Sequence, residues 1–137
     1  MKTPIVCCAG VLVCLTMAVA AAADRQGNYA IWGAGGQSCH QFALSDQDVS
    51  KTAPYRDYLM GYLTAFNAFA PDTYDATGGV TLEATLTWLR RYCDAHAMDS
   101  FERAVGQMLL TQHAARTRLP PGTSAGWGDA RAPPGRP

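Results

Sequence analysis

The stretch TAPYRDYLMGYLTAFNAFA, residues 52–70, decides the fold class of this chain. Its large apolar residues recur at steps of three and four, which is the spacing of one face of an α-helix. This predicted inner face consists of Tyr55, Leu59, Tyr62, Phe66 and Phe69. Tyr58 and Leu63 lie beside it and broaden it. The pattern therefore predicts a long helix that packs against other helices.

The ends of this helix follow from its prolines. Pro54 suits the first helical position, with Thr52 or Ala53 as the cap. The helix is expected to end before Pro71, because the residue that precedes a proline avoids the helical region. Inside it, Gly61 and Ala65 lie four residues apart, and two small side chains on one side predict the close approach of another backbone.

Two further helices are predicted downstream. Thr81 is a natural cap for the first of them, whose apolar face holds Leu82, Leu86, Leu89 and Cys93 with Trp88 and Tyr92 beside it. The second is expected to begin at Asp99, because Glu102 stands three residues later as in a capping box. Its predicted inner face consists of Phe101, Val105, Met108, Leu109 and Gln112.

Upstream of residue 52, Ser38 to Leu44 predicts a short helical turn that carries Cys39 and Phe42. The residues from Tyr29 to Trp32 predict a brief extended segment, and the glycines that follow let it turn. These elements together predict an all-α fold: a small, disulfide-stapled bundle of three main helices plus a short N-terminal helical element, over residues 28–118.

The N-terminus has the pattern of a cleavable signal peptide over residues 1–23. Lys2 supplies a positive charge, Ile5 to Val19 is almost wholly apolar, and a run of alanines precedes Asp24. The apolar run falls short of the ~20 residues that span a bilayer. The alternatives are a retained membrane anchor and a lipid-modified cysteine in this segment. Export predicts a periplasmic or secreted protein without stable membrane insertion after cleavage.

Signal cleavage would leave Cys39 and Cys93 of the five cysteines. Two cysteines in an exported protein predict one disulfide, and the alternative is a pair of buried thiols. Closing a loop of about 54 residues would stabilise the fold by roughly 4 kcal/mol through chain entropy. The bridge would join the short N-terminal element to the end of the second long helix.

Charge and composition limit the partners. The 11 Lys and Arg balance 11 Asp and Glu, so no basic excess exists to bind nucleic acid. Residues 119–137 are rich in proline and glycine and poor in apolar residues, which predicts a disordered tail. Its Trp127 is either a docking residue or incidental.

Catalytic and metal-binding patterns are weak. Cys39-His40 and Cys93 with His96 offer sulfur and imidazole ligands, but the spacing of a zinc site is missing. The segment from Asp72 to Gly78 lacks the alternating ligands of a calcium loop and is expected to cap turns instead. We therefore predict no enzymatic activity, no metal and no cofactor.

The candidates for partner binding lie on the first long helix. Its aromatic residues either fill the core or exceed what the core can bury, in which case Tyr58, Tyr62 or Phe66 forms a patch for a protein partner. Asn67 is polar in an apolar neighbourhood and is expected to bond to the backbone of the following loop, with a functional role as the alternative.

Several short motifs resemble a group of small exported bacterial proteins. They are Ser38-Cys39, the run from Gly61 to Asn67, Trp88-Leu89 with Tyr92-Cys93, Phe101 and Ala104-Val105. The layout, from about Tyr29 to Gln112, is similar to two families: the Rap/Tai immunity proteins, which protect against type VI secretion effectors, and the HdeA/HdeB acid-stress chaperones. Both families are small, periplasmic, helical, disulfide-bearing and often dimeric, and both act by binding proteins. The resemblance implies a non-enzymatic, immunity-like binding module, either a monomer or a homodimer, with an HdeA-like periplasmic chaperone as the alternative.

Overall fold

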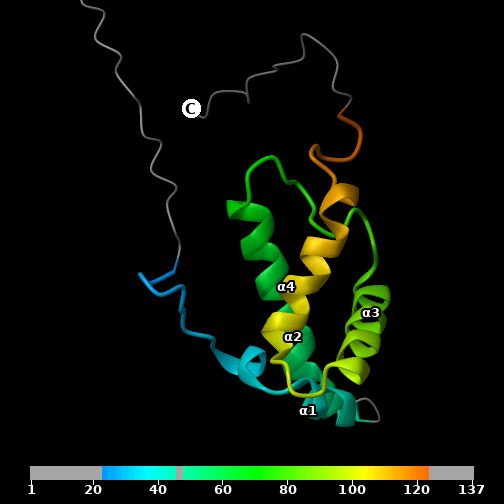
Figure 1. Cartoon of the computed structure of the whole chain (residues 1–137). Coiled ribbons are helices and arrows are strands. Elements are labelled where there is room, and N and C mark those ends of the chain that lie inside the picture. The colour runs from blue at the N-terminus through cyan, green and yellow to red at the C-terminus, as the bar shows by residue number, and fades with distance from the viewer. Residues whose placement is uncertain (1–22, 46–47, 124–137) are drawn as a thin grey trace, which may run out of the picture. The chain divides into compact units, whose positions relative to one another are not determined.

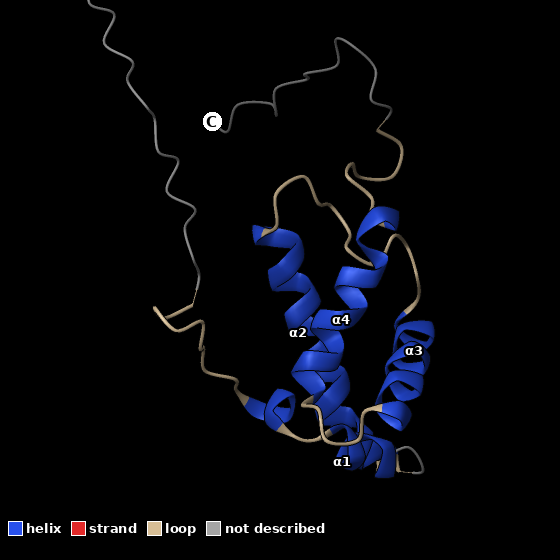
Figure 2. Cartoon of the chain, viewed as in Figure 1, coloured by secondary structure: helices blue, strands red, loops and turns tan. Residues whose placement is uncertain are grey.

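The computed structural model of the chain describes residues 23–45 and 48–123. All the regular structure in these ranges is helical (Figure 2), as the sequence predicts. Residues 1–22 of the predicted signal peptide (1–23) and residues 124–137 of the predicted tail (119–137), with Trp127, lie outside the described residues. Within the described ranges, no helix combines the length and apolar character that crossing a membrane requires.

The chain divides into two compact units, residues 1–30 and 31–137. In the described part of the first unit, Asp24 closes a turn by accepting hydrogen bonds from the backbone N–H groups of Asn28 at 2.7 Å and Gln26 at 2.9 Å. These hydrogen bonds lower the pKa of Asp24, and the bond from the Asn28 N–H has the largest effect. Gly27 has a φ of 86°, a conformation that favours glycine.

The second unit begins with a 3₁₀ turn, η1 (Gly33–Gly36), and a short helix, α1 (Cys39–Leu44). Trp32 is extended and precedes η1 directly, and Gly33 has a φ of 63° that lets the chain turn. Ser38 caps α1 in a full capping box with Gln41. Figure 1 shows α1 at the end of the bundle where α3 (Leu82–Ala95) finishes and α4 (Phe101–Gln112) begins. The Cys39–Cys93 disulfide joins α1 to the last turn of α3, as predicted.

The long helix α2 (Val49–Phe69) starts earlier than the sequence predicts. Asp48 is its cap, because the Asp48 carboxylate accepts the backbone N–H of Ser50 at 2.9 Å. Pro54 therefore lies inside the helix and not at its first position, so the prediction of a start near Thr52 was wrong. Thr52 has another role: its buried hydroxyl donates to the Ser45 carbonyl at 2.7 Å and ties α2 to the end of α1. The helix ends before Pro71, as predicted.

The caps of the other two long helices are both side-chain hydroxyls. Thr81 caps α3 by accepting the N–H of Ala84, as predicted. The cap of α4 is Ser100 and not Asp99, because the Ser100 hydroxyl accepts the N–H of Arg103 at 3.1 Å. The predicted cap was therefore one residue too early, a common error where two polar residues precede a helix.

The core lies between α1, α2, α3 and α4. The rings of Phe42, Tyr55 and Phe101 pack against one another with centroids 4.6 to 5.0 Å apart. Around them lie the fully buried side chains Leu59, Leu86, Leu89, Val105 and Met108. Burial of such side chains contributes about 1.5–3 kcal/mol each. The helix faces predicted for α3 and α4 thus supply most of the core.

Two backbone contacts tie distant segments together at opposite ends of the bundle. At one end, the N–H of Cys39 donates to the Asp99 carbonyl and the N–H of Phe101 donates to the Gln37 carbonyl, both at 2.8 Å. At the other end, the N–H of Tyr74 donates to the Thr117 carbonyl and the N–H of Thr117 donates to the Asp75 carbonyl, both at 2.9 Å, which joins the α2–α3 loop to the segment beyond α4. These bonds satisfy backbone groups in the loops and fix the positions of the helix ends that the loops connect.

Candidate functional site

All four candidates for partner binding lie on α2, but the structure gives them different surroundings. The ring of Tyr58 is half-buried, 6.0 Å from the ring of Phe101 and directly against the backbone of Gly35 in η1. A Cβ atom on Gly35 would overlap this ring. Tyr58 therefore helps to dock η1 onto α2, and only part of its ring faces solvent.

Tyr62 and Phe66 lie side by side on the next turns of α2. The ring of Tyr62 is 5.9 Å from that of Tyr58, and its hydroxyl lies 3.4 Å from a carboxylate oxygen of Glu102 on α4. Glu102 is only 6 % exposed, so this contact fixes the direction of the tyrosine ring. With Ala65, the two aromatic side chains line a shallow, almost wholly apolar hollow of about 190 Å³.

Asn67 turns to the other side of α2 and bonds to backbone, as predicted. Its side-chain oxygen accepts the N–H of Ala76 at 2.9 Å, which fastens the loop between α2 and α3 to the helix. It also borders a second hollow of about 340 Å³ together with Met60, Leu63 and Thr64. The structure therefore brings Tyr62 and Phe66 together and separates Asn67 from them.

Asp75 stabilises the loop beyond Asn67, which agrees with the prediction that this segment caps turns. Its carboxylate accepts the N–H groups of Thr77 and Gly79, both at 2.9 Å. Burial of the carboxylate opposes its charge, but these hydrogen bonds outweigh that effect and lower the pKa of Asp75. The oxygens of Asp75 are thus engaged in the loop itself, which is a structural role.

The predicted inner face of α2 is correct for its first half and wrong at its end. Tyr55 and Leu59 are buried, whereas Phe69 is 87 % exposed. The close backbone approach predicted at Gly61 and Ala65 is also wrong among the described residues, because both residues are exposed and no other segment comes within 4 Å of a Cβ built on Gly61. The helix extends past the elements that cover its first half.

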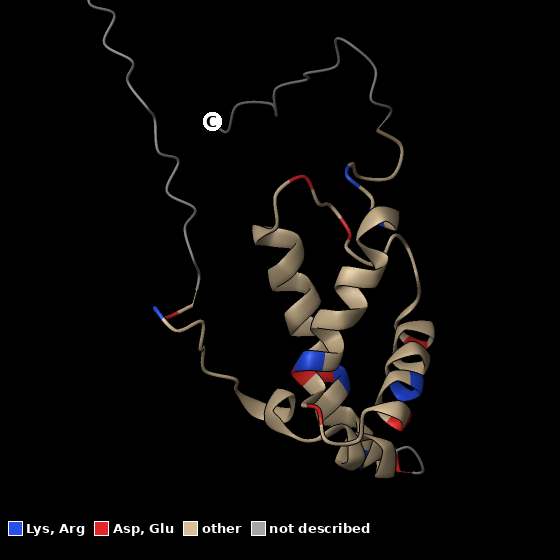
Figure 3. Cartoon of the chain, viewed as in Figure 1, with Lys and Arg blue, Asp and Glu red and all other residues tan. Residues whose placement is uncertain are grey.

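This extension creates a surface that the sequence interpretation missed. We call the exposed residues of this part of the helix the α2 outer face; they are Met60, Gly61, Thr64, Ala65, Ala68 and Phe69. No charged residue occurs between Asp57 and Asp72, and Figure 3 shows this half of α2 without charge. A helix on the surface of a protein normally carries charged or polar residues on its outer side. The missing charge was the available signal, and it is visible in the sequence.

A second aromatic feature lies along α3. The rings of Trp88, Tyr92 and His96 stack in series with centroids 5.7 and 4.1 Å apart, and their planes are nearly parallel. The Tyr92 hydroxyl donates to the carboxylate of Asp99 at 2.7 Å, and this bond, with burial, raises the pKa of Tyr92. These contacts fasten the end of α3 to the start of α4.

Two chemical possibilities raised by the sequence, a metal site and a thiol nucleophile, can be compared with the described residues. Nowhere in residues 23–45 and 48–123 do three His, Cys, Asp or Glu side chains gather as ligands for a metal ion. Cys39 and Cys93 are bonded to each other, so neither is a thiol nucleophile. Comparison with protein families, with curated proteins and with solved structures finds no significant match.

Proposed function

We propose that this chain is an exported, non-enzymatic protein-binding module of the immunity-protein kind, which recognises a partner protein through the α2 outer face. The observation that carries the proposal is the lack of charge on this solvent-facing helix surface. The cores of protein interfaces are depleted in charged residues and enriched in aromatic residues and methionine. Phe69 at 87 % exposure and Met60 at 45 % fit that description.

The hollow beside the outer face supplies a place for a partner side chain. Its lining of Tyr62, Ala65 and Phe66 is almost wholly apolar, and its volume of about 190 Å³ suits one aliphatic or aromatic side chain. Such anchored side chains contribute most of the binding energy at many interfaces. In this proposal Tyr62 and Phe66 contact the partner, while Tyr58 and Asn67 hold the neighbouring segments in place.

The disulfide supports the proposed location of the protein outside the cytoplasm. The Cys39–Cys93 bridge is consistent with an oxidising compartment, where such bonds persist. We therefore place the protein in the periplasm or outside the cell. A second copy of the chain is the competing occupant of the outer face, and it would make the protein a homodimer.

Site-specific photo-crosslinking in the exporting cell tests the proposal. A photoreactive residue replaces Ala65 on the outer face, and a matched control replaces Thr87, which is exposed on α3. We expect a dominant crosslinked protein at position 65 and none at position 87. The charged variant Phe69→Glu should abolish the complex without loss of fold, because this side chain is largely exposed. Equal crosslinking at both positions, or a product that contains only two copies of this chain, would contradict the proposal.

The acid-stress chaperone makes a different prediction about pH. Such a protein loosens in acid and then exposes hidden apolar surface to many clients. The outer face, in contrast, is already exposed in the folded state. We therefore expect no suppression of client aggregation at about pH 2 or at neutral pH. Strong suppression that appears only in acid, together with binding of the dye ANS, would favour the HdeA-like alternative.

A further inference from the structure

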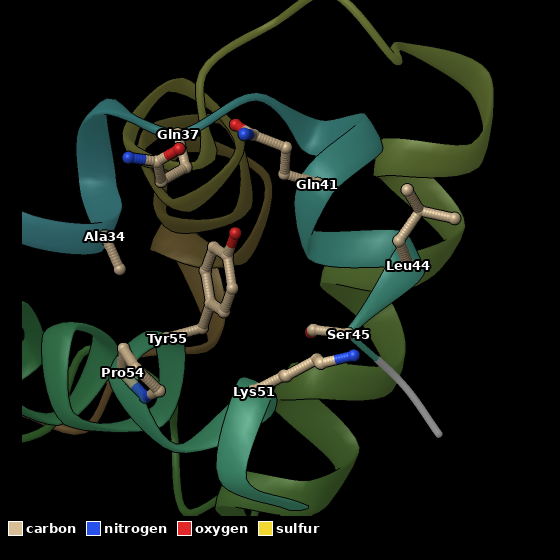
Figure 4. Close-up of a pocket in the computed structure, with 8 residues that line it drawn as sticks. All are labelled: Ala34, Gln37, Gln41, Leu44, Ser45, Lys51, Pro54 and Tyr55. Atoms are coloured by element: carbon tan, nitrogen blue, oxygen red, sulfur yellow. The ribbon is translucent and has the colours of Figure 1, made fainter. Parts of the chain in front are cut away.

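A cavity of about 450 Å³ lies between η1, α1 and the first half of α2 (Figure 4), away from the α2 outer face. We call it the α1–α2 cavity and define it by six of its lining residues: Gln37, Gln41, Leu44, Lys51, Pro54 and Tyr55. Sites for small molecules commonly have volumes of roughly 300–1,000 Å³ and combine apolar walls with a few polar groups. The cavity meets both conditions.

Tyr55 is the unusual residue of this cavity. Its ring belongs to the core, with only 7 % of the residue exposed, and it packs on Phe42 and Phe101. No described residue forms a hydrogen bond with its hydroxyl, which Figure 4 shows directed into the cavity between Gln37 and Gln41. Burial raises the pKa of Tyr55, so the group stays protonated and can donate. A phenylalanine would fill the same core position without a polar group to satisfy.

Two of the other polar residues that line the cavity, Gln41 and Lys51, supply donors, and Gln37 adds an amide with both a donor and an acceptor. The side-chain oxygen of Gln41 already accepts the N–H of Ser38 at 3.1 Å, which leaves the amide NH₂ of Gln41 to donate. Lys51 contributes an ammonium group, whose only described partner is the exposed Asp48 carboxylate at 3.7 Å. Among the described residues no Asp or Glu lines the cavity. A hydroxyl, an amide NH₂ and a cation together complement an anionic group that accepts hydrogen bonds.

The remaining walls are apolar. Leu44 is 68 % exposed at the rim, and Pro54 interrupts the hydrogen bonding of α2 where its backbone passes the cavity. A ligand that fits these walls needs an apolar body as well as an anionic end. Aliphatic and aromatic carboxylates have both.

We propose that the α1–α2 cavity binds a small organic carboxylate. Lys51 and Gln41 hold the carboxylate, the Tyr55 hydroxyl donates to one of its oxygens, and the apolar body lies against Leu44 and Pro54. This site is independent of the function proposed above, because it shares no residue with the α2 outer face. Loss of partner binding would therefore leave carboxylate binding intact.

NMR titration of the exported full chain with benzoate and octanoate tests this proposal, with benzamide and octanamide as neutral controls of the same shape. We expect saturable shifts of amide signals around residues 37, 41 and 51 for at least one acid, and binding about tenfold weaker for its amide. Lys51→Gln should weaken binding about tenfold, whereas Arg91→Gln, which removes an exposed charge on α3, should not.

Tyr55→Phe separates a binding role from a structural one. The variant should weaken binding of the acid about fivefold to tenfold and leave the urea midpoint of unfolding unchanged or higher, because no residue in the described ranges bonds to the hydroxyl. The proposal is overturned if neither acid binds at millimolar concentration, if acid and amide bind equally, or if Tyr55→Phe binds the acid as the native chain does.

Discussion

Replacement of Gly35 by alanine should destabilise this protein through a single side chain, Tyr58. Gly35 is buried in η1, and a Cβ built on it would overlap the Cζ, Cε2 and hydroxyl oxygen atoms of Tyr58. All three contacts fall well inside the 3.0 Å limit that real Cβ atoms respect. Either the tyrosine ring or η1 must therefore move.

The packing around Tyr58 sets the size of the effect. Its ring lies 6.0 Å from that of Phe101 and 5.9 Å from that of Tyr62, so a shift of the ring disturbs both neighbours. Overpacking of this kind costs about 1–3 kcal/mol. Alanine also reduces the freedom of the unfolded chain, which returns about 0.4–1 kcal/mol. We expect a net loss of about 1–2 kcal/mol in the free energy of unfolding.

Gly36 provides the matched control, because it lies in the same turn and a Cβ there meets open space. Gly36→Ala should be neutral or slightly stabilising in equilibrium urea unfolding followed by circular dichroism. In a Tyr58→Ala background, Gly35→Ala should lose its cost, since the overlapping ring is gone. If Gly35→Ala and Gly36→Ala unfold at the same urea concentration, the contact between η1 and α2 has been misjudged.

Three further predictions concern the bridge and the loop between α2 and α3. Reduction of Cys39–Cys93, which are 54 residues apart, should lower the free energy of unfolding by about 4 kcal/mol, and an unchanged urea midpoint after reduction would contradict this. Asp75 has a lowered pKa in the fold, so its stabilising effect is present above the ordinary aspartate pKa and lost as pH falls through the folded value; Asp75→Asn should be less stable at neutral pH, and the difference should vanish in acid unfolding curves. Gly78→Ala should lower the thermal midpoint more than Gly79→Ala, because both have positive φ but only Gly78 faces a backbone carbonyl of η2 (His113–Ala115); equal midpoints would refute the contact.

Local chemistry explains why much of the fold could be predicted. Thr81 caps α3 because its hydroxyl accepts a free backbone N–H at the start of the helix. The helix α2 ends before Pro71 because the residue that precedes a proline avoids the helical conformation. Apolar residues three and four apart place Leu86 and Leu89 on one buried side of α3 for the same local reason. The pairing of Cys39 with Cys93 followed from the cysteine count and the predicted export alone.

The errors at the two ends of α2 depended in part on other segments, whereas the missed caps at Asp48 and Ser100 are local. Pro54 fits a first helical position, yet α2 starts at Val49 because Asp48 caps it and the hydroxyl of Thr52 reaches the carbonyl of Ser45 on the end of α1. Local propensity could not show that α1 would lie there. The periodicity of α2 likewise continues to Phe69, but whether that residue is buried depends on how far the neighbouring helices extend.

The candidate sites divide in the same way. The sequence by itself determined the helices, the bridge and the uncharged run of α2, because these depend on residue type and spacing within one segment. Only the tertiary structure decided that Tyr58 packs under η1, that one side of the second half of α2 faces solvent, and that the hydroxyl of Tyr55 opens into a cavity. Burial and cavities depend on which distant segments cover a side chain, and the apolar periodicity of a single helix does not show which segments these are.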